Sequence, residues 1–336
     1  MLDNPSMARR MTNILVKLLP LFAFIIPTII LYFLDPTVFE KTWKGRMFYV
    51  FFLWLVSLEI ILNWEGLQTE KIKRVRYLRT GAFIVAFLLP TVYVVVSNFY
   101  GLNAMVENLA LESGMKPLWA NVMPLSIEYL VFATLFSLVI LLEYGVRGLK
   151  THSISTLFLT VIGVIYIIDN VYQQNFTPFQ IIVPTTASLA ANVLNFLGYR
   201  TTWLGINNGM PGLVATGSHG SWGAQIAWPC SGVESLLIYA VTILLFLKNS
   251  AIPWKQRIVY FVFGAAVTYF INILRIVTIF IIGVNGGDAM AFHNVYGQLY
   301  SVSWIVFYPL LIMGSRAFWW KIRYNATVKN NLMHAS

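Results

Sequence analysis

Apolar runs of about twenty residues recur along this chain, and they constrain its fold more than any other feature. A helix needs about 20 apolar residues to cross the roughly 30 Å hydrocarbon core of a bilayer. Only 11% of the 336 residues are charged, against about 25% in an average soluble domain. The sequence therefore predicts an all-α polytopic membrane protein rather than a soluble globular domain.

Eight runs have the length and composition of transmembrane helices. They cover residues 14–34, 47–63, 82–100, 122–142, 154–172, 231–247, 258–282 and 293–315. The first run is too long for the apolar core of a signal peptide and no small-residue cleavage site follows it, so we expect it to be retained. The prediction is one integral domain with three parts: residues 1–175, residues 176–229, and a catalytic part with a cytoplasmic tail at residues 230–336.

The middle part lacks a clean apolar run. Residues 179–199 are apolar but interspersed with Gln, Thr, Ser and Asn, a pattern that favours a helix lying in or re-entering the membrane interface. Three short strand-like runs follow, separated by turns rich in Gly, Asn and Ser, at residues 202–206, 212–216 and 222–227. We therefore predict a small extracellular helix and β-element before span 6.

Lysine and arginine residues are distributed unevenly between the predicted loops. With the N-terminus in the cytoplasm, the inside segments hold 17 of these cations and the outside segments hold five. Cytoplasmic loops carry such an excess, so eight spans with both termini in the cytoplasm are predicted. A ninth span at 179–199 would turn the last two basic segments outward. The net charge of +10 then reflects orientation in the membrane, and no nucleic-acid partner is expected.

Three chemically useful side chains fall at the outer membrane face in this topology. Cys230, the only cysteine in the chain, opens span 6. Arg275 is the one cation buried in a predicted span, since Lys17 lies at the cytoplasmic end of the first span and is counted with the N-terminal segment. Arg275 stands 18 residues after Arg257, about 27 Å along a helix. His293 opens span 8. These residues did not enter the topology count, so their common depth is independent support for a site.

The local sequence indicates a reactive role for Cys230, although free cysteines are also common core residues. Ser231 and Glu234 have the S-x-x-E spacing of a capping box, which predicts that span 6 begins at Ser231. The sulfur would then lie beside the positive end of the helix dipole, where the pKa of a thiol falls. Asn272 lies one helical turn before Arg275, and we expect it to orient the guanidinium.

Simpler roles for these residues stay open at this point. Arg275 could reach the interface or form a structural ion pair with Glu128, Asp169 or Glu234. His293 could be a solvated interfacial histidine. His219 could serve as the base instead, but its loop of Gly and Ser residues favours a turn or solvent-exposed position.

The order and spacing of three motifs resemble the exosortase/archaeosortase family. Cys-Ser-Gly at 230–232 opens one span, Asn-x-x-Arg at 272–275 lies in the next, and His-x-x-Tyr-Gly at 293–297 opens the last. The resemblance covers about the last 110 residues, and the first five spans match only in architecture. The compact chain without a fused domain favours an archaeosortase, whereas His293 keeps the exosortase-like form, since some archaeal members have Arg at that position.

The resemblance implies a membrane cysteine transpeptidase. Its substrates would be surface-protein precursors that end in a short motif, a transmembrane helix and a basic tail, and a membrane lipid would accept the new C-terminus. By residue match, Cys230 is the nucleophile, Arg275 stabilises the thiolate or the oxyanion, and His293 is the general acid/base. The supporting residues are Asn272, Glu234, Ser231 and Tyr296. No cofactor is expected, and one Cys with four His does not form a metal ligand set.

Two other function classes are compatible with parts of the sequence. An intramembrane serine protease or acyltransferase would need a catalytic serine, but Ser231 and Ser235 fit cap and helix positions better. A transporter would line its pathway with the intramembrane charges Glu59, Glu128, Asp169 and Arg275, but no inverted repeat is visible in the sequence. We therefore expect a multi-pass cell-membrane enzyme with its active site on the extracellular face.

Overall fold

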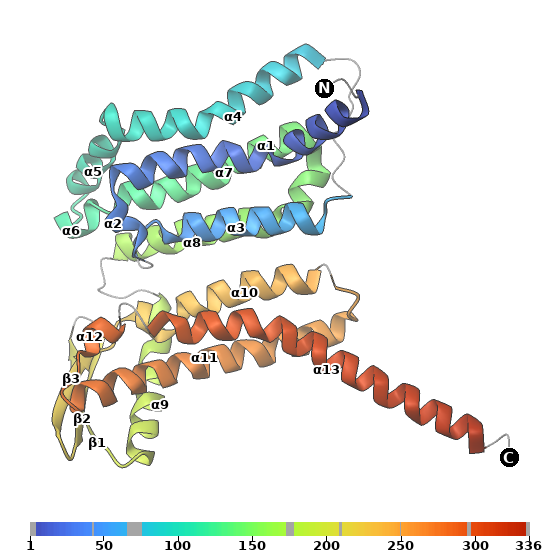
Figure 1. Cartoon of the computed structure of the whole chain (residues 1–336). Coiled ribbons are helices and arrows are strands. Elements are labelled where there is room, and N and C mark those ends of the chain that lie inside the picture. The colour runs from blue at the N-terminus through green and yellow to red at the C-terminus, as the bar shows by residue number, and fades with distance from the viewer. Residues whose placement is uncertain are drawn as a thin grey trace. The chain divides into compact units, whose positions relative to one another are not determined.

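The computed structural model describes residues 5–41, 44–65, 76–172, 178–207, 210–248, 250–293 and 297–333. The chain forms two compact units, residues 1–177 and residues 178–336. Unit 1 is helical throughout its described part, and unit 2 combines helices with a small sheet (Figure 1).

The long helices of unit 1 correspond to the first five predicted spans. They are α1 (Pro5–Leu34), α3 (Met47–Leu62), α4 (Arg76–Phe99), α7 (Met123–Thr151) and α8 (Ser153–Tyr172). Three short helices connect them, namely α2 (Pro36–Phe39), α5 (Leu102–Glu112) and α6 (Pro117–Ala120). The segment 101–121, predicted as a loop, therefore contains two helices. The backbone of Gly145, at φ +65°, interrupts α7 near the predicted end of span 4.

Aromatic side chains hold the core of unit 1 together. Phe24 of α1 is fully buried. It makes edge-to-face contacts with Phe52, Phe132 and Phe136 at centroid distances of 5.4–5.6 Å. Such pairs contribute about 0.5–1.5 kcal/mol each beyond the burial of their area. These contacts fix α1 against α3 and α7.

Two buried carboxylates of unit 1 pair with cations that precede α3. Arg46 donates to both carboxylate oxygens of Glu128 at 2.8 and 3.0 Å, and Lys44 Nζ lies 2.9 Å from Asp169. Burial lowers the pKa of Lys44 to about 8, and the attraction of Asp169 offsets part of that effect. Glu128 and Asp169, two of the three acidic residues named as possible ion-pair partners of Arg275, are thus paired within unit 1.

Glu59, the third intramembrane carboxylate of unit 1, caps a helix. Its oxygens accept hydrogen bonds from the N–H groups of Ile154 and Ser155 at 3.1 and 3.3 Å, and from the Ser155 hydroxyl at 2.6 Å. A carboxylate at a helix N-terminus satisfies otherwise unpaired donors and complements the helix dipole. The carboxylates that a transporter would need therefore have structural partners.

Unit 2 contains the segments that carry the predicted site. It begins with the 3₁₀ helix η1 (Pro178–Ile182), helix α9 (Val183–Phe196) and the strands β1 (Arg200–Asn207), β2 (Met210–Gly217) and β3 (Gly220–Gln225). The 3₁₀ helix η2 (Trp228–Ser231) leads into α10 (Val233–Lys248), α11 (Trp254–Val284), α12 (Ala289–Ala291) and α13 (Gly297–Met333). A helical segment and a three-stranded element thus lie where the sequence predicts them, and their place outside the membrane stays a prediction.

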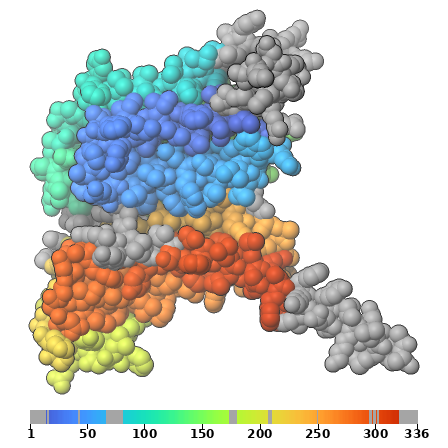
Figure 2. Space-filling view, viewed as in Figure 1, coloured from blue at the N-terminus to red at the C-terminus, as the bar shows by residue number. Residues whose placement is uncertain are grey.

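The three strands form an antiparallel sheet in the order β1-β2-β3. Leu213 and Ala215 of β2 are fully buried, and Trp222 of β3 packs edge-to-face on Phe280 of α11, with centroids 5.0 Å apart. The sheet, α9 and the C-terminal part of α11 therefore gather at one end of unit 2, as both views show (Figures 1 and 2).

Within the described residues, five helices are long and apolar enough to cross a membrane. They contain the segments Lys17–Leu34, Gly81–Phe99, Pro117–Thr151, Ser153–Tyr172 and Trp254–Val284, and Met47–Leu62 is a shorter apolar helix. Large apolar side chains are exposed along α11, at Ile258, Val259, Val262, Phe263 and Phe270. An apolar surface of this kind is typical of a membrane contact. The chain is thus a multi-pass membrane protein, and the count of eight spans stays a prediction.

Candidate active site

Cys230 lies in η2, the short turn between the sheet and α10. Its N–H donates to the Ala227 carbonyl at 3.0 Å, so this donor is already used within the turn. The next residue but one, Gly232, has a φ of +99°, a conformation that glycine adopts without the steric cost of a Cβ. The backbone therefore reverses sharply after the cysteine and sets the thiol beside α11 rather than in line with α10.

The predicted capping box at the start of this helix is wrong. α10 begins at Val233, and its first turn is closed by a hydrogen bond from Leu236 N–H to the Gly232 carbonyl at 2.9 Å. The Ser231 hydroxyl donates to the Trp228 carbonyl at 2.5 Å and so stabilises η2 instead. The left-handed glycine separates Ser231 from the helix, so this serine is not its cap.

The pKa of the Cys230 thiol shifts in the direction opposite to the one expected. Burial raises this pKa, and the positive charge of Arg275 offsets part of the increase, while the Glu234 carboxylate adds to it. The dipole argument considered only the helix end and omitted desolvation, which disfavours the charged thiolate. The thiol is therefore protonated at neutral pH and needs a base to become a nucleophile.

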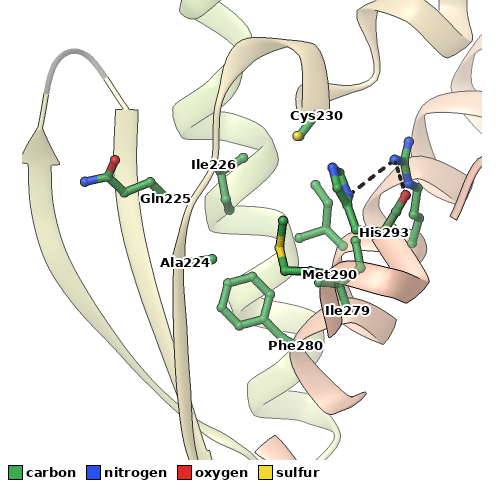
Figure 3. A pocket seen from close by; sticks show the side chains of 10 residues that line it. Ala224, Gln225, Ile226, Cys230, Ile279, Phe280, Met290 and His293 are labelled. Atoms are coloured by element: carbon green, nitrogen blue, oxygen red, sulfur yellow. Dashed lines mark hydrogen bonds between the residues drawn. The ribbon is translucent and has the colours of Figure 1, made fainter. Parts of the chain in front are cut away.

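Arg275 of α11 and His293, which follows α12, are in direct contact. Arg275 Nη2 lies 3.4 Å from both Nδ1 and the carbonyl oxygen of His293 (Figure 3). A guanidinium only donates, so Nδ1 is the acceptor and the neutral ring carries its proton on Nε2. The usual range for such bonds is about 2.7–3.2 Å, so this bond is weak. Burial and the Arg275 charge both lower the pKa of His293, which keeps the ring neutral at neutral pH.

Asn272 binds the cysteine turn instead of orienting Arg275. Its Nδ2 donates to the Cys230 carbonyl at 2.9 Å, and its side chain is almost fully buried. A Cβ on Gly232 would lie 3.1–3.3 Å from the Asn272 side chain, so the glycine also gives this amide room. The hydrogen bond ties α11 to the turn that carries the sulfur.

A second glycine, Gly297, makes room for Arg275. It is the first residue of α13, and a Cβ there would lie 2.7 Å from Arg275 Nε. This Nε is buried and has no hydrogen-bond partner among the residues that the structure describes. Sequence reasoning named neither Gly232 nor Gly297 as a functional residue, although both stand in the quoted motifs. Tyr296, the remaining predicted supporting residue, lies outside the described residues.

Cys230, Arg275 and His293 line one pocket of about 140 Å³. The thiol and the imidazole point into it, as Figure 3 shows. Its other walls are the end of β3 and an apolar surface that includes Phe280 and Met290. An engineered apolar cavity of about 150 Å³ holds benzene, so this pocket accommodates one side chain. It therefore places a thiol, a guanidinium and an imidazole around the space of a single residue.

The other candidates from the sequence lie elsewhere. His219 is exposed in the hairpin turn between β2 and β3, where its Nδ1 is 3.0 Å from the Ser218 hydroxyl, and it does not line the pocket. Ser231 is fully buried, with its hydroxyl bound to a backbone carbonyl. The structure thus brings together all three residues predicted as catalytic, and His219 lies outside their pocket.

A comparison with protein families matches this geometry. The model of the transmembrane exosortase family (Exosortase_EpsH) matches residues 40–311, which includes spans where the sequence had suggested only a common architecture. The chain belongs to this family. Exosortases are membrane cysteine transpeptidases that act on proteins bearing sorting signals. The match gives no support to the preference for an archaeosortase. Neither a curated protein nor a solved structure matches the chain.

Proposed function

We propose that this protein cleaves the C-terminal sorting signal of surface-protein precursors through a thioester on Cys230. The observation that carries the proposal is that Cys230, Arg275 and His293, which are distant in sequence, line one pocket. The family of the chain independently indicates a cysteine transpeptidase of sorting signals. Beyond the family, we propose the roles of these three residues, a membrane lipid as the acceptor of the cleaved precursor, and an active site on the extracellular face.

In the first half-reaction, the substrate enters with its scissile carbonyl beside the sulfur. Binding breaks the weak contact between Arg275 and His293, which frees a ring nitrogen as the base. The thiol proton moves to His293 while sulfur bonds to the carbonyl carbon. His293 then gives that proton to the departing amine, and the carbon–nitrogen bond breaks. The transmembrane helix of the precursor leaves with the new amine, and the upstream part stays on Cys230 as a thioester.

Arg275 stabilises the negative oxygen of the tetrahedral intermediate. The Cys230 N–H, a common donor for such an oxygen, is occupied by the Ala227 carbonyl. Arg275 lines the pocket, and its Nη2 is held by two weak contacts of 3.4 Å to His293. The guanidinium is therefore the donor that the turn does not supply. Losing one oxyanion donor costs about 2.7–4 kcal/mol in a well-studied protease.

In the second half-reaction, a nucleophile resolves the thioester. An amine or hydroxyl on a membrane lipid headgroup attacks the carbonyl carbon, gives its proton to His293, and releases the sulfur, which regains a proton. Water would give hydrolysis by the same route. We propose the lipid as acceptor because cleavage removes the transmembrane helix of the precursor. The upstream part of the precursor would then lose its membrane anchor unless a lipid replaced that helix.

The proposed topology places this chemistry at the extracellular face of the cell membrane. It comprises eight spans with both termini in the cytoplasm, and it is supported by the uneven distribution of cations. Two of the five outside cations, Lys44 and Arg46, pair with the buried Asp169 and Glu128. Their position outside therefore has a structural reason that leaves the positive-inside bias intact.

The decisive experiment is mass spectrometry of a tagged precursor co-expressed with the enzyme. The precursor is a protein from the same genome that ends in a short motif, an apolar helix and a basic tail. With the native enzyme we expect a trimmed C-terminus carrying the mass of a lipid. Cys230→Ala should leave the protein folded, judged by its thermal unfolding in detergent, and should abolish trimming. Unchanged trimming by this variant would refute the mechanism.

A further inference from the structure

The strand β3 has one free edge. The sheet order is β1-β2-β3, so among the described strands β3 pairs with β2 alone. Ile226, just past the strand, donates its N–H to the Pro211 carbonyl of β2 at 2.9 Å. Backbone groups of successive strand residues alternate between the two sides of a strand. The register then directs the N–H and C=O groups of Ser221, Gly223 and Gln225 away from β2.

These outward groups are available for pairing. Ser221, Gly223 and Gln225 are exposed, and within the described part of the chain no backbone hydrogen bond involves their outward side. The opposite edge of the sheet differs, because a bulge between Trp203 and Gly205 disrupts β1. Bulges protect an edge against added strands, so β3 is the regular, accessible edge.

The free edge of β3 borders the pocket of Cys230. Three consecutive residues, Ala224, Gln225 and Ile226, line that pocket. Figure 3 shows Ala224 and Ile226 on the pocket side of the strand and Gln225 pointing away from it. Successive side chains lie on opposite faces, so a cavity that touches all three reaches the backbone edge of the strand. The edge and the reactive thiol are therefore parts of one continuous surface.

We infer that this edge binds the precursor as an added β-strand, through the residues that precede the scissile bond. The inference rests on the proposed function and identifies how its substrate is held. The pocket of about 140 Å³ takes one residue, so a signal of several residues needs an extended surface beside it. An exposed strand edge supplies main-chain hydrogen bonds to any extended peptide, and nearby pockets supply specificity.

The direction of the added strand follows from the direction of β3. This strand runs toward η2 and Cys230, and α10 then enters the proposed membrane span. The transmembrane helix of the precursor lies downstream of the scissile bond and has to enter the membrane as α10 does. The upstream residues therefore run beside β3 in parallel. In the thioester they stay on this edge, while the helix departs.

A proline scan of the precursor tests the inference. In an added strand, every second residue directs its N–H toward β3, and the residues between direct theirs to solvent. Proline lacks this N–H and is tolerated in an edge strand only where the N–H faces solvent. Proline at successive positions upstream of the scissile bond should therefore reduce trimming about tenfold at alternate positions. Alanine at the same positions separates loss of the N–H from loss of the side chain.

Disulfide cross-linking provides a second measurement. Cys230→Ala removes the only cysteine of the chain, so Gln225→Cys in that background gives a single thiol beside the edge. It should cross-link to precursor cysteines at alternate upstream positions. Thr202→Cys, exposed on the bulged strand β1, is the matched control and should not cross-link.

The outcomes separate this inference from the proposed function. Trimming that depends on Cys230, with no alternation in the proline scan and equal cross-linking at both strands, would overturn the added strand and leave the function standing. Trimming that survives Cys230→Ala would overturn both. Alternation with selective cross-linking to β3 would establish this edge as the substrate subsite.

Discussion

Gly297→Ala tests the placement of Arg275 without changing any charged group. The new Cβ would lie 2.7 Å from Nε and 3.4 Å from Cζ of Arg275. The distance to Nε is shorter than folded proteins allow. The guanidinium is held on its other side by contacts of 3.4 Å to His293, which are weak. We therefore expect the guanidinium to swing away from the pocket while α13 stays in place.

The expected loss follows from the role of the guanidinium. If Arg275 donates to the oxyanion, its displacement removes an interaction made only in the transition state, so kcat falls and KM changes little. Complete loss of such a donor costs about 2.7–4 kcal/mol, which corresponds to about 10²- to 10³-fold. We expect a decrease of about 100-fold, measured as the trimming rate of a purified precursor with the enzyme in detergent.

Gly314→Ala is the matched control because it lies in the same helix. A Cβ at Gly314 meets nothing within 4 Å, and alanine favours the helix by about 1 kcal/mol. This variant should trim at the native rate. A native rate for Gly297→Ala would show that the position of the guanidinium does not matter. A rise in KM alone would reassign Arg275 from the transition state to substrate binding.

Three further predictions concern charge and protonation. The guanidinium of Arg275 lowers the pKa of the Cys230 thiol and so offsets part of the increase caused by burial. Arg275→Gln should therefore shift the alkylation of Cys230 by iodoacetamide, measured by mass spectrometry, to higher pH. A shift to lower pH would contradict this. The pKa of His293 lies below its ordinary value of 6.5, so the imidazole is neutral above that pH. The value of kcat/KM should therefore be constant near neutral pH and decrease only below about pH 6.5. A decrease that begins above pH 6.5 would exclude His293 as the base. Arg46→Met leaves the buried Glu128 without its cation, although the Tyr49 hydroxyl still donates to it. This variant should be destabilised by about 3–5 kcal/mol in chemical unfolding. A loss under about 1 kcal/mol would mean that the carboxylate is solvated or neutral.

Apolar length predicts the ends of a long helix only where they coincide with abrupt changes in composition. The predicted end of span 8 at residue 315 is wrong for its helix, because α13 continues through the polar tail to Met333. The run 154–172 corresponds to α8 at Ser153–Tyr172, where charged and polar residues flank the helix. The loop 101–121 was predicted without structure, yet it forms α5 and α6. Those helices are short, and short helices depend on packing against their neighbours rather than on their own sequence. A composition pattern does not contain that information.

The candidate catalytic residues Cys230 and Arg275 could be predicted because each is costly or rare where it stands, whereas His293 was identified by its motif and its predicted membrane depth. An arginine within a span and a lone cysteine at a span end both require an explanation. The contacts between them could not be predicted, since Asn272 could reach either Arg275 or the cysteine turn. Its bond to the Cys230 carbonyl depends on the left-handed backbone of Gly232, which the capping pattern concealed.

The protonation states of the pocket explain how a reactive thiol can persist in an open site. Burial raises the pKa of Cys230 and lowers that of His293, so both groups are neutral when the pocket is empty. Oxidation of a cysteine follows its thiolate character and exposure, and a half-buried neutral thiol is therefore protected. In the proposed mechanism, proton transfer to His293 becomes favourable only when Arg275 leaves the imidazole for the developing oxyanion. If the peptide carbonyl itself draws Arg275 away, as we propose, the nucleophile forms at the moment when its target is in place.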